Sequence, residues 1–129
     1  MVTDIIKVLV VDDEVEVCEL MRDFLRKKNY CTFGASSAAE AIELVKNESP
    51  HIVLLDLRLG SDSGLELLRR IKETDRNIKV IMVTALDDKD TVEQAISLGA
   101  EEFITKPFTL KFLEDTLLRK VEKFIPKRR

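Results

Sequence analysis

The sequence is poor in several residue types that define common classes of protein. Its 129 residues include no tryptophan, one histidine, two cysteines, three prolines and four glycines. The single histidine, His51, excludes a histidine-rich metal cluster by count. Cys18 and Cys31 lack metal-ligand spacing and lie in apolar patterns, so we expect buried free thiols rather than a disulfide. With 45% hydrophobic and 35% charged residues, the composition favours a globular chain over a disordered or fibrous one.

The sequence also lacks a long apolar run and an excess of positive charge. No run approaches the roughly 18 residues of a membrane span, and residues 1–7 have no signal-peptide zones. The net charge of −3 argues against direct binding of nucleic acid. We therefore expect a cytoplasmic protein with no membrane contact. One domain should cover residues 1–125, with residues 126–129 as a basic tail or the start of a linker.

What the sequence does contain is a fivefold alternation of short apolar runs with amphipathic segments. The apolar runs predict buried strands and the three-to-four periodicity predicts helices. This order predicts an α/β fold, a single doubly wound (βα)5 domain with a five-stranded parallel sheet and right-handed crossovers. The expected strands are 8–11, 30–34, 52–55, 78–83 and 103–105. The expected helices are about 15–28, 38–49, 64–73, 88–98 and 110–125.

Polar residues follow four of these expected strands. In a parallel sheet all carboxyl ends meet at one edge, so the topology should gather these side chains into one site. They are Asp12, Asp13, Asp56, Thr84 and Lys106. Carboxylates about 4 Å apart repel each other by roughly 1 to 4 kcal/mol, which invites a cation. Because the ligands are hard oxygens, Mg²⁺ is favoured.

A metal among carboxylates, with a lysine and a hydroxyl beside it, is suited to phosphoryl transfer. A carboxylate can itself serve as the nucleophile and become an aspartyl phosphate. Asp56 is our choice for that role because it stands alone at its strand end, whereas Asp12 and Asp13 are adjacent and better placed to share an ion. Each residue alone has a simpler explanation as a cap or a surface charge. The combination at four strand ends is far more specific.

Six short motifs carry a resemblance to a known family. They are Val-Val-Asp-Asp-Glu at 10–14, Val-Leu-Leu-Asp at 53–56, Gly64, Val-Thr-Ala at 83–85, Gly-Ala at 99–100 and Lys-Pro-Phe at 106–108. Through them, about residues 5–125 resemble a response-regulator receiver domain, the CheY-like phosphoacceptor module of two-component signalling. The resemblance implies the sheet order 2-1-3-4-5. It also implies a phosphorylation-controlled switch rather than an enzyme that turns over an external metabolite.

The resemblance implies a role for each site residue. Asp56 would accept the phosphoryl group from a phosphohistidine on a sensor histidine kinase or histidine phosphotransfer protein. Asp13, Asp56 and the backbone carbonyl of Arg58 would bind Mg²⁺, which Mn²⁺ could replace. Asp12 would act mostly through water.

Further implied roles concern the signal that follows phosphorylation. Lys106 would pair with the phosphoryl oxygens and Thr84 would hydrogen-bond one of them. Phe103 falls at the aromatic switch position, and the bond between Lys106 and Pro107 would be cis. The surface of the fourth helix, fifth strand and fifth helix would then change and engage an unknown output protein or domain, or a second copy of the chain.

The sequence departs from the family in the loop after Asp56. Where family members usually have proline, four residues after Asp56, this chain has Gly60, so we expect a more mobile loop.

Two other kinds of protein share parts of this pattern. A phosphatase resembling the haloacid-dehalogenase family would place its nucleophile after the first strand and usually add a cap domain, for which there is no room. A flavodoxin-type FMN carrier shares the fold, but the first strand lacks its phosphate loop.

Overall fold

The computed structural model describes residues 5–85, 89–106 and 109–125. Five parallel strands form one sheet in the order β2-β1-β3-β6-β7, as expected from the sequence. They are β1 (Lys7–Val11), β2 (Cys31–Ala35), β3 (Ile52–Asp56), β6 (Lys79–Ala85) and β7 (Glu102–Lys106). The helices are α1 (Val15–Lys27), α2 (Ala38–Glu48), α3 (Gly64–Thr74), α4 (Lys89–Ser97) and a C-terminal run of α5 (Leu110–Phe112), the π-helix η1 (Leu113–Leu117) and α6 (Leu118–Glu122).

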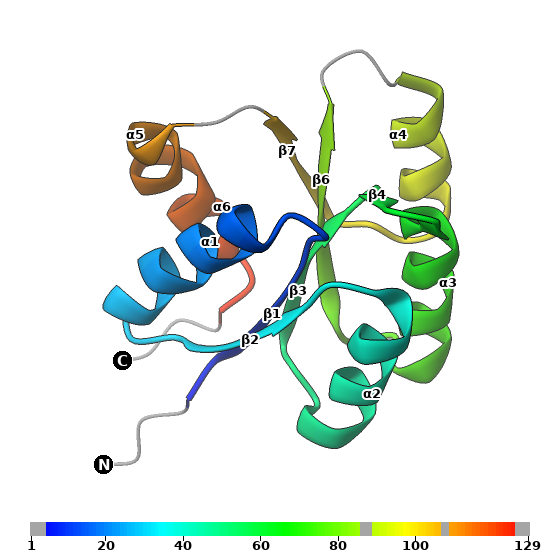
Figure 1. Ribbon diagram of the computed structural model, residues 1–129, viewed down its shortest axis with the longest axis horizontal. Coiled ribbons are helices and arrows are strands. Elements are labelled where there is room, and N and C mark those ends of the chain that lie inside the picture. Colours follow the sequence, from blue (N-terminus) through cyan, green and yellow to red (C-terminus); the bar gives the residue numbers. More distant parts are fainter. Residues whose placement is uncertain (1–4, 86–88, 107–108, 126–129) are drawn as a thin grey trace.

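The helices cover both faces of the sheet. In Figure 1, α1 and the C-terminal run lie on one side, and α2, α3 and α4 lie on the other. Alternate residues of β1 explain why both faces are apolar: Val8 and Val10 join the core under α1, while Leu9 and Val11 join the core under α2 and α3. Among the described residues, no helix is both long enough and apolar enough to cross a membrane.

The parallel pairing brings the strand ends to one edge. The register sets Asp56 of β3 beside Val83 of β6, and Ala85 of β6 beside Lys106 of β7. Asp12 follows β1 directly and donates its amide to the carbonyl of Ala35, at the end of β2. The expectation that separate segments meet at this edge is therefore confirmed.

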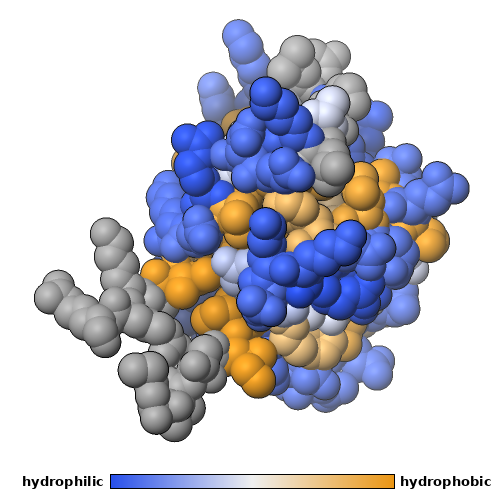
Figure 2. All heavy atoms as spheres, turned by 90° about the vertical axis from the view of Figure 1, so that its left-hand side faces the viewer, coloured by the Kyte–Doolittle hydropathy of each residue, from blue (hydrophilic) through white to orange (hydrophobic). Residues whose placement is uncertain are grey.

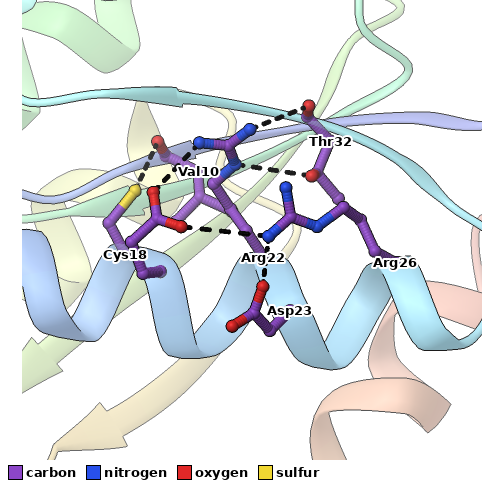
Figure 3. A network of polar contacts seen from close by, with 7 residues as sticks. Val10, Cys18, Arg22, Asp23, Arg26 and Thr32 are labelled. Carbon is purple, nitrogen blue, oxygen red and sulfur yellow. Dashed lines mark hydrogen bonds and ion pairs between the residues drawn. The ribbon is translucent and has the colours of Figure 1, made fainter.

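Helix α1 is tied to the edge strand β2 by an arginine. Arg22 donates to the hydroxyl and to the carbonyl of Thr32, both at 3.4 Å, and to the Glu19 carboxylate at 3.1 Å (Figure 3). Gly34 leaves room for this crossing, since a Cβ there would lie 3.1 Å from Arg22 and from the Cys18 sulfur. Figure 2 shows that the face carrying α1 is mainly hydrophilic, with smaller hydrophobic areas between the charged side chains.

The C-terminal helix differs from the expected continuous α-helix because it contains the π turn η1. Its buried residues Leu113, Leu117 and Val121 are spaced by four. Four residues of an α-helix exceed one full turn by about 40°, so a strict spacing of four drifts away from the core. The wider π turn counteracts this drift and keeps all three side chains buried.

The loop after Asp56 forms a hairpin, a feature that the sequence did not predict. Strands β4 (Arg58–Leu59) and β5 (Asp62–Ser63) pair antiparallel across the two-residue turn Gly60-Ser61. Gly60 has φ 61°, which suits the first turn position of a type II′ hairpin.

Gly99 and the two cysteines can also be compared with the sequence. Gly99 has φ 103° after α4, as a helix stop requires. Cys18 is a buried free thiol, but Cys31 is only half-buried because β2 is an edge strand. The predicted cis bond at Pro107, the helix start at residue 88 and the tail 126–129 lie outside the described residues.

Candidate functional site

Four carboxylates meet at the carboxyl edge of the sheet. Asp12, Asp13 and Glu14 follow β1 and Asp56 ends β3, and each places a carboxylate oxygen within 4.8 Å of the others. Asp12 and Asp56 are buried, with 2% and 6% of their surface exposed, whereas Asp13 and Glu14 are exposed. Three of these four were predicted. The sequence analysis missed Glu14, although its position directly after two aspartates was a usable signal.

Lys106 at the end of β7 neutralises part of this charge. Its ammonium nitrogen lies 2.9 Å from Asp56 Oδ2, 3.1 Å from Asp12 Oδ2 and 3.2 Å from Glu14 Oε1. Burial disfavours the charged ammonium, but the hydrogen bond to Asp56 and the ion pairs with Asp56 and Asp12 outweigh burial and raise the pKa of Lys106 above its usual range. The lysine is therefore a fixed positive charge at the centre of the site.

Backbone amides orient the two buried carboxylates. Asp12 Oδ1 accepts from the amide of Glu14 at 2.9 Å, and Asp56 Oδ1 accepts from the amide of Arg58 at 3.1 Å. Each aspartate thus has one oxygen held by the chain and the other directed to Lys106. Burial raises the pKa of Asp12, and the hydrogen bond from the Glu14 amide and the nearby Lys106 ammonium only partly oppose this effect.

A pocket of about 360 Å³ opens over these groups. Thr84 of β6, 4% exposed, is one of the residues that line it. The predicted residues in the lining share one edge of the sheet, and Asp12 lies among the same carboxylates. The lining residues are Asp13, Glu14, Asp56, Leu57, Arg58, Thr84 and Lys106.

Phe103 does not line this pocket. It lies on β7 opposite Met82 of β6, half-buried, and packs against the core under α2 and α3. Because side chains alternate along a strand, Thr84 points to the same face of the sheet as Met82 and hence as Phe103. The threonine and the phenylalanine are therefore neighbours on one face, although only the threonine reaches the pocket.

The donor set fits a hard divalent cation. All four clustered side chains offer carboxylate oxygens, the ligands that Mg²⁺ takes in proteins. Within the described part of the chain, the buried Asp12 Oδ2 makes no hydrogen bond of good geometry, although Lys106 is 3.1 Å away. A buried oxygen that is ion-paired with Lys106 but has no well-aligned hydrogen bond is an arrangement that an additional cation or its water would satisfy.

Comparison with known proteins places the chain and its fold in one class. Residues 8–118 match the family model of the response regulator receiver domain. The chain is 35% identical over 120 residues to sporulation initiation phosphotransferase F of Bacillus subtilis (strain 168), covering 93% of this chain and 94% of that protein.

Solved structures agree with this match. A CheY-like receiver domain protein of Methanospirillum hungatei JF-1 superposes with a TM-score of 0.84 at 25% identity, covering 94% of this chain and 97% of that one. The receiver domain of NtrX from Brucella abortus superposes with a TM-score of 0.80 at 33% identity, covering 89% and 98%. The chain belongs to the response-regulator receiver family. It is a phosphorylation-dependent switch of two-component signalling.

Proposed function

We propose that Asp56 is the phosphoacceptor of this switch. The observation that carries the proposal is that Asp56 is buried at the edge of an open pocket, with Lys106 2.9 Å from one oxygen and the Arg58 amide 3.1 Å from the other. An Asp56 oxygen would bond to the phosphorus of a phosphohistidine while the phosphorus–nitrogen bond breaks. The electron pair stays on the imidazole nitrogen, which then takes up a proton. The donor is a sensor histidine kinase or a histidine phosphotransfer protein.

The surrounding residues divide the work of binding and charge neutralisation. Asp13, Asp56 and the Arg58 carbonyl would hold Mg²⁺, for which Mn²⁺ could substitute, and Asp12 would act through water. Such a cation would supply positive charge beside the transferred group. Lys106, already a fixed cation in the pocket, pairs with the phosphoryl oxygens. Thr84 donates its hydroxyl to one of them.

The output follows from the placement of Thr84 and Phe103 on one face of the sheet. Movement of Thr84 toward the phosphoryl group changes the space available to the Phe103 ring. The surface of α4, β7 and the C-terminal helix then changes and binds an output protein or domain, or a second copy of the chain. The protein acts in the cytoplasm, contacts neither nucleic acid nor membrane directly, and turns over no external metabolite.

The test is labelling with Mg²⁺ and acetyl phosphate, followed by intact mass and by sedimentation. We expect one phosphoryl group per chain and none on Asp56→Asn. Asp75→Asn, which removes an acid from the opposite edge of the sheet, serves as the control and should label like the parent. Equal labelling of Asp56→Asn would refute the assignment. Release of many equivalents of phosphate per chain from a small phosphomonoester would instead favour a phosphatase.

A further inference from the structure

The hairpin that follows Asp56 is fixed to the body of the protein at two points. Leu59 of β4 is 3% exposed and belongs to the core under α2 and α3. On β5, Asp62 Oδ2 accepts from the amide of Ala38 at 3.0 Å, in a partly buried contact between residues 24 positions apart. The hairpin is therefore held by apolar packing on one strand and by a carboxylate on the other.

The partner of Asp62 is a helix end. Ala38 is the first residue of α2, so its amide belongs to the first turn, where an α-helix has no internal acceptor for its N–H groups. The Ser37 side chain accepts from the Glu40 amide in the same turn, and Asp62 supplies an acceptor from another segment. A carboxylate at this end is also favoured by the helix dipole.

The same hairpin reaches the carboxylate cluster. The Arg58 amide donates to Asp56 Oδ1 at 3.1 Å, and Arg58 lines the pocket. At the turn, a Cβ added to Gly60 would lie 3.8 Å from Asp13 Oδ2. Figure 1 shows β4 beside the start of α3, at the edge where the parallel strands end. The β4–β5 hairpin therefore contacts α2 through Asp62 and lies beside the site at Arg58 and Gly60.

We propose that Asp62 is a positioning residue for the cation site. Through the hairpin it holds the backbone at Arg58 and the turn at Gly60 in their places beside Asp56 and Asp13. Glycine in the turn leaves the main chain more freedom than other residues would. The tether to α2 removes part of that freedom before the cation binds, so less conformational entropy is lost on binding. This inference rests on the proposed cation site.

The coupling must operate in both directions. If the Asp62–Ala38 hydrogen bond favours cation binding, cation binding must strengthen that hydrogen bond by the same factor. The Ala38 amide therefore reports on the site without any phosphoryl transfer. Added Mg²⁺ should slow hydrogen exchange of this amide in the parent protein.

The experiment compares Asp62→Ala, Asp62→Asn and the control Asp75→Ala in Mg²⁺ titrations by calorimetry. Asp75 is a matched control because its carboxylate accepts from the Asn77 amide at 2.9 Å, far from the site. Loss of a residue that orients metal ligands typically costs about 10- to 100-fold in affinity. We expect Asp62→Ala to raise the Kd for Mg²⁺ about tenfold, near the lower end of that range. Asparagine keeps an acceptor oxygen and should show a smaller rise, and the control should show none.

Further readouts separate positioning from a general loss of structure. At saturating Mg²⁺, the labelling rate of Asp62→Ala with acetyl phosphate should return to within about twofold of the parent rate, because only affinity is lost. A lower melting temperature with an unchanged Kd for Mg²⁺ would overturn the inference. Hydrogen exchange of the Ala38 amide that does not change with Mg²⁺ would also overturn the inference. In both cases the proposed function would stand if Asp56 is still labelled. Failure of the parent protein to bind Mg²⁺ would overturn both the inference on Asp62 and the proposed function.

Discussion

Lys106 Nζ lies 2.9 Å from Asp56 Oδ2, so the last strand of the sheet holds a carboxylate 50 positions earlier in the chain. The same ammonium lies 3.1 Å from Asp12, which follows the first strand. Lysine at this place offsets the repulsion between carboxylates that would otherwise oppose folding. A cation or phosphoryl group entering the pocket must share these contacts with Lys106.

Replacing Lys106 by methionine should destabilise the protein most strongly when no divalent cation is present. Removing one partner of a buried ion pair costs about 3–5 kcal/mol, and the open pocket reduces this to about 2 kcal/mol here. Because Mg²⁺ can take over the neutralisation, it should bind Lys106→Met more tightly than the parent and restore part of the loss. Urea unfolding in EDTA and in Mg²⁺ measures both effects.

Lys111→Met, which removes an exposed lysine from α5, is the control for this experiment. It should change the free energy of unfolding little in either condition. A loss for Lys106→Met that is equal with and without Mg²⁺ would contradict the idea that the ammonium and the divalent cation neutralise the same carboxylates.

Glu102 at the start of β7 should give the protein an acid-sensitive component of stability. It accepts hydrogen bonds from Lys120 of α6 at 2.8 Å and from Lys123, the residue that follows α6, at 2.9 Å. These contacts, with that of Lys120 the larger, lower the pKa of Glu102 to about 2. The folded protein therefore binds this proton less readily than the unfolded chain, whose glutamate titrates near 4.5. The stabilisation should be complete above pH 4.5 and should disappear as the pH falls toward about 2.

The measurement is urea unfolding of the parent and Glu102→Gln across this pH range. At pH 7 we expect the substitution to cost about 1–2 kcal/mol, since the contacts are charge-assisted but partly exposed to water. Measuring Lys120→Met alone and together with Glu102→Gln completes a double-mutant cycle, which isolates the interaction energy of the Glu102–Lys120 pair. A difference between parent and Glu102→Gln that does not change with pH would show that the carboxylate charge is not the source of the stability.

Hydrophobic periodicity predicted the strands and the edge where they end, but it did not predict contacts made by only a few residues. The strand pattern was sufficient to predict that Asp56 and Lys106 meet, because parallel topology alone brings strand ends together. Hairpin β4–β5 was not predicted, since two-residue strands contain no detectable period. The sequence suggested a more mobile loop at Gly60, which stays a prediction, and it did not show that the positive φ of this residue serves a tight turn.

Contacts between side chains were the least predictable part. The helical pattern of α1 puts Arg22 on the polar face, yet its side chain crosses to the carbonyl of Thr32 on the edge strand. Nothing in a helical periodicity states where a long side chain ends. Asp62 resembles any polar loop residue in sequence, and only the folded chain shows that it reaches the first amide of α2.

Gly64 and Gly34 provide a matched pair for testing how closely α3 must approach β3, the strand that ends in Asp56. A Cβ on Gly64 would lie 2.5 Å from the carbonyl oxygen of Asp56 and 2.6 Å from Leu57 Cα, both backbone atoms. At Gly34 the nearest atoms, at 3.1 Å, belong to the side chains of Arg22 and Cys18, which can move. Alanine at position 64 must therefore displace the helix or the strand, whereas alanine at position 34 needs only side-chain adjustment.

We expect Gly64→Ala to cost about 3 kcal/mol, at the upper end of the range for overpacking, and Gly34→Ala about 1 kcal/mol. Because the strain at position 64 acts on the backbone of Asp56, labelling by acetyl phosphate should slow in Gly64→Ala even where the protein remains folded. Gly34→Ala should label at the parent rate. Urea unfolding and labelling rates measured on the same samples test this, and equal losses for the two variants would show that the approach of α3 to Asp56 is not a constraint on the site.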